Sequence, residues 1–217
     1  MTLHFRPEAV VFDNDGLLVD SEACWTKAEA TIFAERGLDY PPSIKSEFIG
    51  KSVPDTVRLM AERFGEIGNE AAIGTQLLRL AAEVIAAEAE PMPGAVELVT
   101  SLRGRMPIAV ASNSPRALVE AALRPAGLWG RFDALVSFDD VAVGKPAPDL
   151  YLKACSLLRA TPEHCLAFED SETGLASARA AGLAVVGVPT LKNVEFDADL
   201  VVDSLADPDL VGWAASW

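Results

Sequence analysis

Two carboxylates follow directly on an apolar stretch near the start of the chain. Residues 10–12 have the composition of a buried strand, and Asp13, Asn14, Asp15 and Gly16 come next. Side chains two residues apart leave an extended backbone on the same side, so the two acids point into one space. Their charges, about 4 Å apart, repel by about 4 kcal/mol at an effective dielectric of about 20, and a bound divalent cation would offset this repulsion. The same residues also suit an Asx-turn that closes a strand, and this short pattern alone does not separate the two interpretations.

More side chains that can do chemistry stand at the ends of later apolar stretches or just before a helix. In chain order they are Ser112, Asn113, Lys145, Glu169 and Asp170. Each has an ordinary explanation as a helix cap or a solvated charge. In an open parallel sheet, however, the carboxyl ends of the strands meet at one edge, where ligands bind. The joint occurrence of acids, a hydroxyl and a lysine at successive strand ends therefore favours a single site.

Histidine and cysteine chemistry is not indicated. The two histidines, His4 and His164, are not placed as catalytic bases, which argues against Ser-His-Asp and Cys-His mechanisms and against histidine-ligated zinc. The three cysteines form no Cys-x-x-Cys pair, and we interpret them as buried, reduced thiols. Carboxylates, the lysine and a metal ion must therefore carry any reaction.

The elements that position these residues alternate regularly from residue 93 onward. Apolar stretches predict strands at 108–111, 134–137, 165–168, 184–188 and 200–202. Helical spacing predicts helices that begin near residue 94, at 115 after a Ser114 cap, at 148 and at 174. The strands are too uniformly apolar for a sheet with one solvated face. The pattern predicts the α/β class, with a doubly wound, mostly parallel, Rossmann-like sheet.

The first strand is separated from the others by an interval that is too long for one crossover connection. Within it, helical spacing predicts helices at 21–36, 53–64 and 69–90. We therefore predict an all-helical cap domain, residues 17–92, inserted into an α/β core domain formed by residues 1–16 and 93–217. The two connections between the domains would act as a hinge.

Composition limits the partners of the protein. The chain has 217 residues, 50% of them apolar and 23% charged, as is usual for a globular protein. The net charge of −14 argues against nucleic acid and against anionic membranes, which both need a basic surface. No charged-then-apolar leader and no apolar run of membrane-spanning length stand in the sequence, so we expect a soluble, cytoplasmic protein. The oligomeric state is not indicated, and a monomer is compatible with the sequence.

Four ordered groups of residues resemble the motifs of the haloacid dehalogenase-like (HAD) hydrolase superfamily. The groups are Asp13-Asn14-Asp15-Gly16, Ser112, Lys145 within Gly-Lys-Pro, and Glu169-Asp170-Ser171 with Gly174. The insertion point after Gly16 is similar to that of the superfamily's class with a helical cap, called C1. Residues 13–22 resemble the subgroup that contains β-phosphoglucomutase and sugar-phosphate phosphatases. The resemblance covers essentially the whole chain.

The resemblance implies a role for each matching residue. Asp13 would be the nucleophile that attacks phosphorus and forms an aspartyl-phosphate. Asp15 would protonate the leaving alkoxide and then activate water. Ser112 and Asn113 would donate hydrogen bonds to the phosphoryl oxygens, and Lys145 would neutralise charge on those oxygens in the transition state.

The resemblance also implies Mg2+ as the cofactor. The ion would be held by the carboxylates of Asp13 and Asp170 and by the backbone carbonyl of Asp15, with Glu169 nearby. Its charge would screen the anionic nucleophile from the anionic substrate.

Some positions depart from the family pattern or lie outside its motifs. Asn14 stands where an apolar residue is usual, and we expect little effect there. Trp25 stands where the mutase would have a histidine, which favours a phosphatase; its ring would stack on a sugar or fill the cap core. Gly50 and Lys51 begin a Gly-Lys-Ser sequence, but Lys45 replaces the upstream glycine of a P-loop and no strand precedes it. Gly50 and Lys51 are instead candidates for contact with the distal half of the substrate, with a solvated lysine as the alternative.

These inferences predict a Mg2+-dependent phosphatase that acts on a small phosphorylated metabolite, with a sugar phosphate as the expected substrate. A true dehalogenase has no phosphoester leaving group and so needs no acid to protonate one. The presence of Asp15 therefore argues against that activity. Two alternatives stay open: phosphoryl transfer within a sugar, as in β-phosphoglucomutase, and a non-catalytic module that binds a phosphorylated metabolite. The substrate itself is not identified, because the cap would select it.

Overall fold

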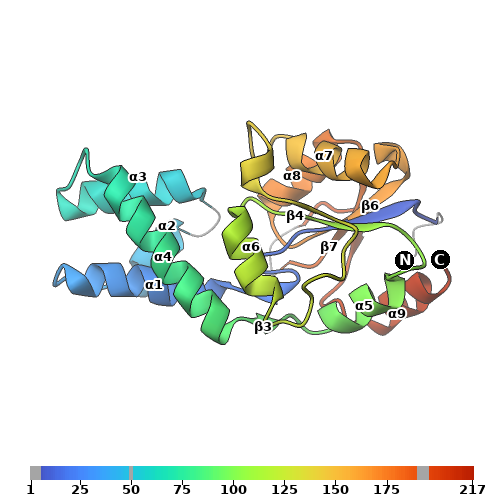
Figure 1. Ribbon diagram of the computed structural model, residues 1–217, viewed down its shortest axis with the longest axis horizontal. Helices are drawn as coiled ribbons and strands as arrows, with labels where there is room; N and C mark the ends of the chain where they lie inside the picture. The colour runs from blue at the N-terminus through green and yellow to red at the C-terminus, as the bar shows by residue number, and fades with distance from the viewer. Residues whose placement is uncertain (1–5, 49–50, 190–195) are drawn as a thin grey trace.

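A parallel sheet forms the centre of the computed structural model, which describes residues 6–48, 51–189 and 196–217 (Figure 1). Its six strands lie in the order β5 (Ala134–Val136), β4 (Ile108–Ala111), β1 (Ala9–Phe12), β6 (Cys165–Glu169), β7 (Ala184–Gly187) and β8 (Leu200–Val201). Every neighbouring pair is parallel. From β1 the chain builds outward on one side and then on the other, so the order reverses at β1. The predicted doubly wound sheet is confirmed.

Helices cover both faces of the sheet. One face carries α7 (Asp149–Leu158) and α8 (Glu172–Ala180), and the other carries α5 (Ala95–Leu102), α6 (Arg116–Leu123) and α9 (Pro208–Ala215) (Figure 1). Alternate residues of β1 serve the two faces: Val11 packs toward α7 and α8, whereas Val10 and Phe12 belong to the opposite cluster. Burial on both sides explains why the strand is apolar throughout.

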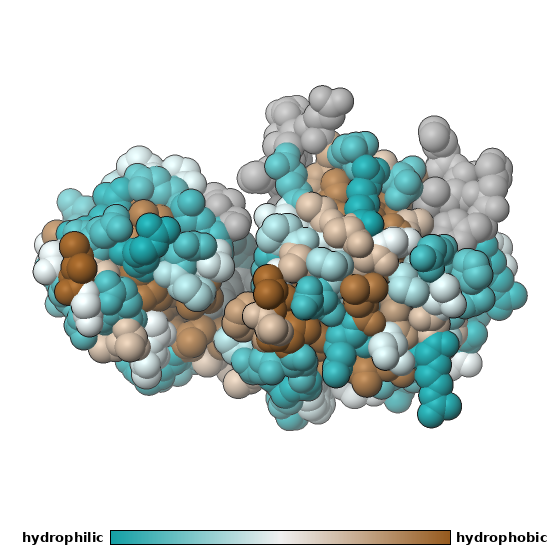
Figure 2. Space-filling view, turned by 90° about the horizontal axis from the view of Figure 1, so that it is seen from above, coloured by the Kyte–Doolittle hydropathy of each residue, from teal (hydrophilic) through white to brown (hydrophobic). Residues whose placement is uncertain are grey.

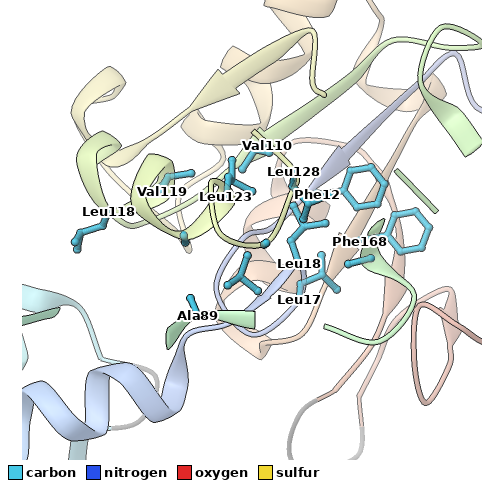
Figure 3. Close-up of a cluster of buried hydrophobic side chains, with 14 of the residues drawn as sticks. Phe12, Leu17, Leu18, Ala89, Val110, Leu118, Val119, Leu123, Leu128 and Phe168 are labelled. Carbon is cyan, nitrogen blue, oxygen red and sulfur yellow. The ribbon is translucent and has the colours of Figure 1, made fainter. Parts of the chain in front are cut away.

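The end of β1 is fixed by an aromatic pair. Phe12 and Phe168 are paired in the parallel register, fully buried, and stacked with ring centroids 5.0 Å apart. Leu17, Leu18 and Ala89 join the same buried cluster (Figure 3). The segments that leave and re-enter the sheet region are therefore packed against its core, and the turn that carries the first two acids is held in place.

The inserted segment is helical, as predicted, and lies beyond the carboxyl ends of the strands (Figure 1). It contains α1 (Glu22–Glu35), α2 (Pro42–Phe48), α3 (Val53–Phe64) and α4 (Glu70–Glu88). Figure 2 shows the insert and the α/β part as two lobes. The short α2 was not predicted. The two connections to the insert also pair as antiparallel strands, β2 (Val19–Asp20) with β3 (Glu90–Pro91), and this pairing was not predicted either.

All three cysteines are free and buried, as expected. None of the described helices is both long and apolar enough to cross a lipid bilayer. The cytoplasmic location stays a prediction.

A buried acid ties the insert together. Glu29 on α1 accepts hydrogen bonds from the Tyr40 hydroxyl and, at 3.3 Å, from Lys45 Nζ, which also lies 2.6 Å from Glu22. Burial raises the pKa of Glu29, although both donors act in the opposite direction. A carboxyl with a raised folded-state pKa stabilises the fold below its unfolded pKa and loses that contribution as the pH rises through the folded value.

We expect the stability of Glu29→Gln relative to the wild type to increase as the pH rises from the ordinary glutamate pKa through the raised pKa of Glu29. Glutamine keeps an acceptor oxygen for Tyr40 and never takes on the buried charge, so the difference in the free energy of unfolding should grow with pH. Urea unfolding of both proteins across this range measures the difference in their free energies of unfolding. Groups that titrate alike in the two proteins cancel in that difference. A difference that stays constant with pH would contradict the prediction.

Candidate active site

The ends of three strands and one loop bring the predicted residues together. Asp13 follows β1, Ser112 follows β4, Glu169 ends β6, and Lys145 lies in the loop before α7. The Asp13 backbone N–H donates to the Phe168 carbonyl over 3.0 Å, so the β1–β6 ladder continues to the first acid. These residues were chosen from sequence spacing, and the parallel sheet places them at one edge, as its geometry requires.

Lys145 is held between two buried acids. Its Nζ lies 2.5 Å from Asp13 Oδ1 and 2.6 Å from Glu169 Oε1, and its side chain is 4% exposed. Burial lowers the pKa of the lysine, but the carboxylates of Asp13 and Glu169 outweigh this effect and raise it above its usual range. The ammonium group therefore stays charged at neutral pH.

Glu169 is enclosed on all sides. Its Oε1 also accepts a hydrogen bond of 2.5 Å from the Tyr151 hydroxyl, and its Oε2 accepts one of 3.3 Å from Ser171. A Cβ at Gly174 would lie 2.0 Å from the Glu169 carboxylate, so any other residue there would displace that carboxylate. Burial, followed by the charges of Glu169 and Asp13, raises the pKa of Tyr151 well above its usual value, so the phenol remains a donor.

Three acids lie close enough to share a metal ion. Carboxylate oxygens of Asp13, Glu169 and Asp170 all lie within 4.8 Å of one another. Burial raises the pKa of Asp13 to about 7 against the effect of Lys145, with further upward contributions from Glu169 and Asp15. Burial, Asp13 and Glu169 also raise the pKa of Asp170 well above its usual value. Hard carboxylate oxygens crowded in this way fit Mg2+, which would relieve their mutual repulsion.

Asp15 is oriented by three hydroxyl groups. Ser21 donates to its Oδ1 over 2.8 Å, while Ser112 and Ser114 donate to its Oδ2 over 3.1 and 2.9 Å. Ser21 and Ser114 were not predicted as site residues. The interpretation of Ser114 as a helix cap was wrong, because Asp139 caps α6 by accepting the Arg116 backbone N–H over 2.9 Å. The Ser-x-Ser spacing that follows β4 is the sequence pattern that could have identified Ser114 as a site residue.

Asn113 connects two loops of the site. Its Oδ1 accepts the Lys145 backbone N–H over 2.7 Å, and its Nδ2 donates to the Lys145 carbonyl over 3.3 Å. A Cβ at Gly144 would lie 2.5 Å from that Oδ1. The Asn113 side chain thus fixes the backbone at Lys145, the candidate catalytic lysine. The sequence did not suggest this role. The predicted contact of Asn113 with a phosphoryl group stays a prediction.

The residues predicted from the insert are not brought to this cluster by any described contact. Trp25 is half-buried and packs against the large apolar cluster, and Lys51 is exposed. Gly50 lies outside the described residues. Asn14, by contrast, is fully buried, and neither polar atom of its side chain has a hydrogen-bond partner among the described residues. We expected little effect at this position, yet an unpaired buried amide costs about 1–3 kcal/mol.

Comparison with known proteins agrees with this geometry. A family model described as "haloacid dehalogenase-like hydrolase" matches residues 7–182. The chain is 33% identical over 210 residues to validoxylamine A 7'-phosphate phosphatase of Streptomyces hygroscopicus subsp. limoneus, covering 92% of this chain and 95% of the relative. It is 31% identical to the Escherichia coli fructose-1-phosphate phosphatase YqaB, covering 87% and 100%. The structure of CbbY from Rhodobacter sphaeroides with phosphate superposes with a TM-score of 0.81 at 29% identity, over 93% of this chain and 96% of CbbY.

The close approach of Gly174 to Glu169 generates a prediction with a matched control. Gly174→Ala should cost about 1–3 kcal/mol of stability and lower activity at least about ten-fold, because the Glu169 carboxylate must move and take Lys145 with it. Gly212→Ala in α9 meets nothing within 4 Å and should instead stabilise the protein by about 0.5–1 kcal/mol with activity unchanged. Urea unfolding and phosphate release measure both variants. Equal behaviour of the two substitutions would show that the Glu169 contact is unimportant.

Proposed function

The chain belongs to the haloacid dehalogenase-like hydrolase family, and we propose that it is a Mg2+-dependent phosphatase that hydrolyses a small phosphomonoester, with sugar phosphates as the substrate class. The observation that carries the proposal is the contact of Lys145 with Asp13 and Glu169 beside Asp170. It joins a nucleophile, a fixed positive charge and a candidate metal site. The names of the relatives, which are phosphatases of phosphorylated sugars or sugar-like compounds, support the substrate class.

In the proposed reaction, Asp13 attacks phosphorus and the bond to the leaving oxygen breaks, which gives an aspartyl-phosphate and an alcohol. Asp15, held by its serine hydroxyls, gives a proton to the leaving oxygen. It then takes a proton from the water that hydrolyses the aspartyl-phosphate. Lys145 donates to the phosphoryl oxygens with the ammonium hydrogen that its two carboxylate contacts leave over. Ser112 has one hydroxyl hydrogen, which would pass from Asp15 to a phosphoryl oxygen when the substrate binds, and Asn113 would hold the same phosphoryl group.

Mg2+ bound by the carboxylates of Asp13 and Asp170 and the backbone carbonyl of Asp15 would supply the charge that lets an anionic nucleophile approach an anionic substrate. Glu169 already accepts hydrogen bonds at both oxygens, so we assign it beside the ion and not as its main ligand.

In this proposal, residues 1–16 and 93–217 form the catalytic core domain, and residues 17–92 form a cap domain that selects the substrate. Trp25, Gly50 and Lys51 are the cap residues that we assign to the distal part of the substrate. We place the protein in the cytoplasm, where its free thiols would stay reduced.

Phosphoryl transfer within a sugar is the competing function, because residues 13–22 resemble the subgroup that contains β-phosphoglucomutase. The indole of Trp25 cannot replace the histidine expected there, because its N–H donates but does not accept a proton. Incubation with a sugar 1-phosphate separates the two functions. A phosphatase releases inorganic phosphate, whereas a mutase forms the 6-phosphate without net release.

Replacement of the nucleophile tests the proposal directly. Asp13→Asn should lower phosphate release at least about a thousand-fold, because an amide cannot form the acyl phosphate. Asp20→Asn, which removes an exposed acid from β2, should leave activity within about two-fold of the wild type. A panel of sugar phosphates, nucleotides and phosphoglycolate, assayed with and without Mg2+, gives the measurement. Undiminished turnover by the Asp13→Asn variant, or turnover that does not depend on Mg2+, would contradict the mechanism.

A further inference from the structure

Tyr151 places a hydroxyl group beside the charged side chains of the candidate active site. The residue is fully buried on α7, on the same helix face as Leu150, Ala154 and Cys155. A phenylalanine would satisfy this apolar contact equally well. The hydroxyl therefore needs its own explanation, since a buried phenol requires a hydrogen-bond partner.

The partner of the hydroxyl is the oxygen that holds the lysine. Tyr151 donates to Glu169 Oε1 over 2.5 Å, and Lys145 Nζ lies 2.6 Å from the same atom. The ammonium also lies 5.1 Å from the centroid of the tyrosine ring, within the range of a cation–π contact. Tyr151 thus interacts with Lys145 in two ways: indirectly, through the shared Glu169 oxygen, and directly, through the tyrosine ring.

We propose that Tyr151 is a positioning residue for the phosphoryl-transfer step, acting on Lys145 through Glu169. This inference rests on the proposed function. Two of the three ammonium hydrogens of Lys145 are directed at Asp13 and Glu169, and the third is left for the phosphoryl group. By sharing Glu169 Oε1, the phenol limits how strongly that oxygen attracts the lysine. The tyrosine ring, whose centroid lies 5.1 Å from Nζ, adds a cation–π attraction that helps to hold the ammonium in this position.

Loss of the hydroxyl would change catalysis more than substrate binding. Without it, Glu169 Oε1 has only the lysine as donor and draws Nζ away from Asp13. The phosphoryl oxygens reach their equatorial positions only in the transition state, so a displaced ammonium costs more there than in the substrate complex. The effect should therefore fall on kcat and leave KM nearly unchanged.

The chain contains a matched control. Its only other tyrosine, Tyr40, donates in the same way to a buried glutamate, Glu29, that also contacts a lysine, Lys45. This second constellation lies in the helical insert and includes no residue of the proposed machinery. Tyr40→Phe removes the same type of hydrogen bond from the same protein.

The experiment compares Tyr151→Phe, Tyr40→Phe and the wild type at saturating Mg2+. The probes are p-nitrophenyl phosphate, whose leaving group needs no proton from Asp15, and the sugar phosphate that the wild type hydrolyses fastest. Rates are expressed per folded molecule, with the folded fraction taken from urea unfolding. We expect kcat of Tyr151→Phe to fall about ten-fold on both probes with KM within about two-fold. For Tyr40→Phe, both parameters should stay within about two-fold of the wild type.

Other outcomes overturn the inference. An unchanged kcat of Tyr151→Phe, or an equal loss in both variants, would show that the hydroxyl contributes only stability. A KM that rises while kcat is kept would show that it acts in binding. A Tyr151→Phe protein that does not fold would also assign the hydroxyl to stability. Failure of the wild type to release phosphate from any probe would instead contradict the proposed function itself.

Discussion

A buried lysine shared by two buried carboxylates is the interaction on which the candidate active site depends. At 7% and 0% exposure, Asp13 and Glu169 would be poor places for negative charge without the ammonium of Lys145, which lies within 2.6 Å of both. Asp170 adds a third carboxylate to the same cluster, within 4.8 Å of the other two. Carboxylates gathered this closely are the physical reason to expect a divalent ion, and this reason is independent of any family resemblance.

The rest of the fold holds these charges at fixed separations. Parallel pairing of β1 with β6 sets Asp13 beside Glu169, and the stacked rings of Phe12 and Phe168 lock that pairing one residue earlier. Asn113 clamps the backbone of Lys145 from the neighbouring strand end. Helix α8 can approach Glu169 because it carries glycine at position 174. Each constraint comes from a different part of the chain, so the site exists only once the sheet has formed.

Sequence reasoning succeeded where one residue type at one position decides the outcome. Apolar stretches that end in acids predicted β1 and β6, and the edge of a parallel sheet then predicted that Asp13 and Glu169 meet. It failed where roles depend on which side chain faces which, across elements distant in the chain. Ser114 reads as a helix cap until Asp139, from a later loop, takes that place. The ribbon of β2 and β3 was missed because two-residue strands carry no periodicity.

The position of Asp15 supports the proposal that the insert, and not the sheet, distinguishes substrates. Two of the hydroxyls that orient Asp15 belong to the loop after β4, but the third belongs to Ser21, the residue before α1. Trp25 lies one helical turn further, about 6 Å along the axis. In the proposed mechanism, a leaving group that receives a proton from Asp15 would therefore emerge beside the first turn of α1. The phosphoryl group would contact core residues, which suit any phosphomonoester, whereas the group attached to it would fit against the helices of the insert.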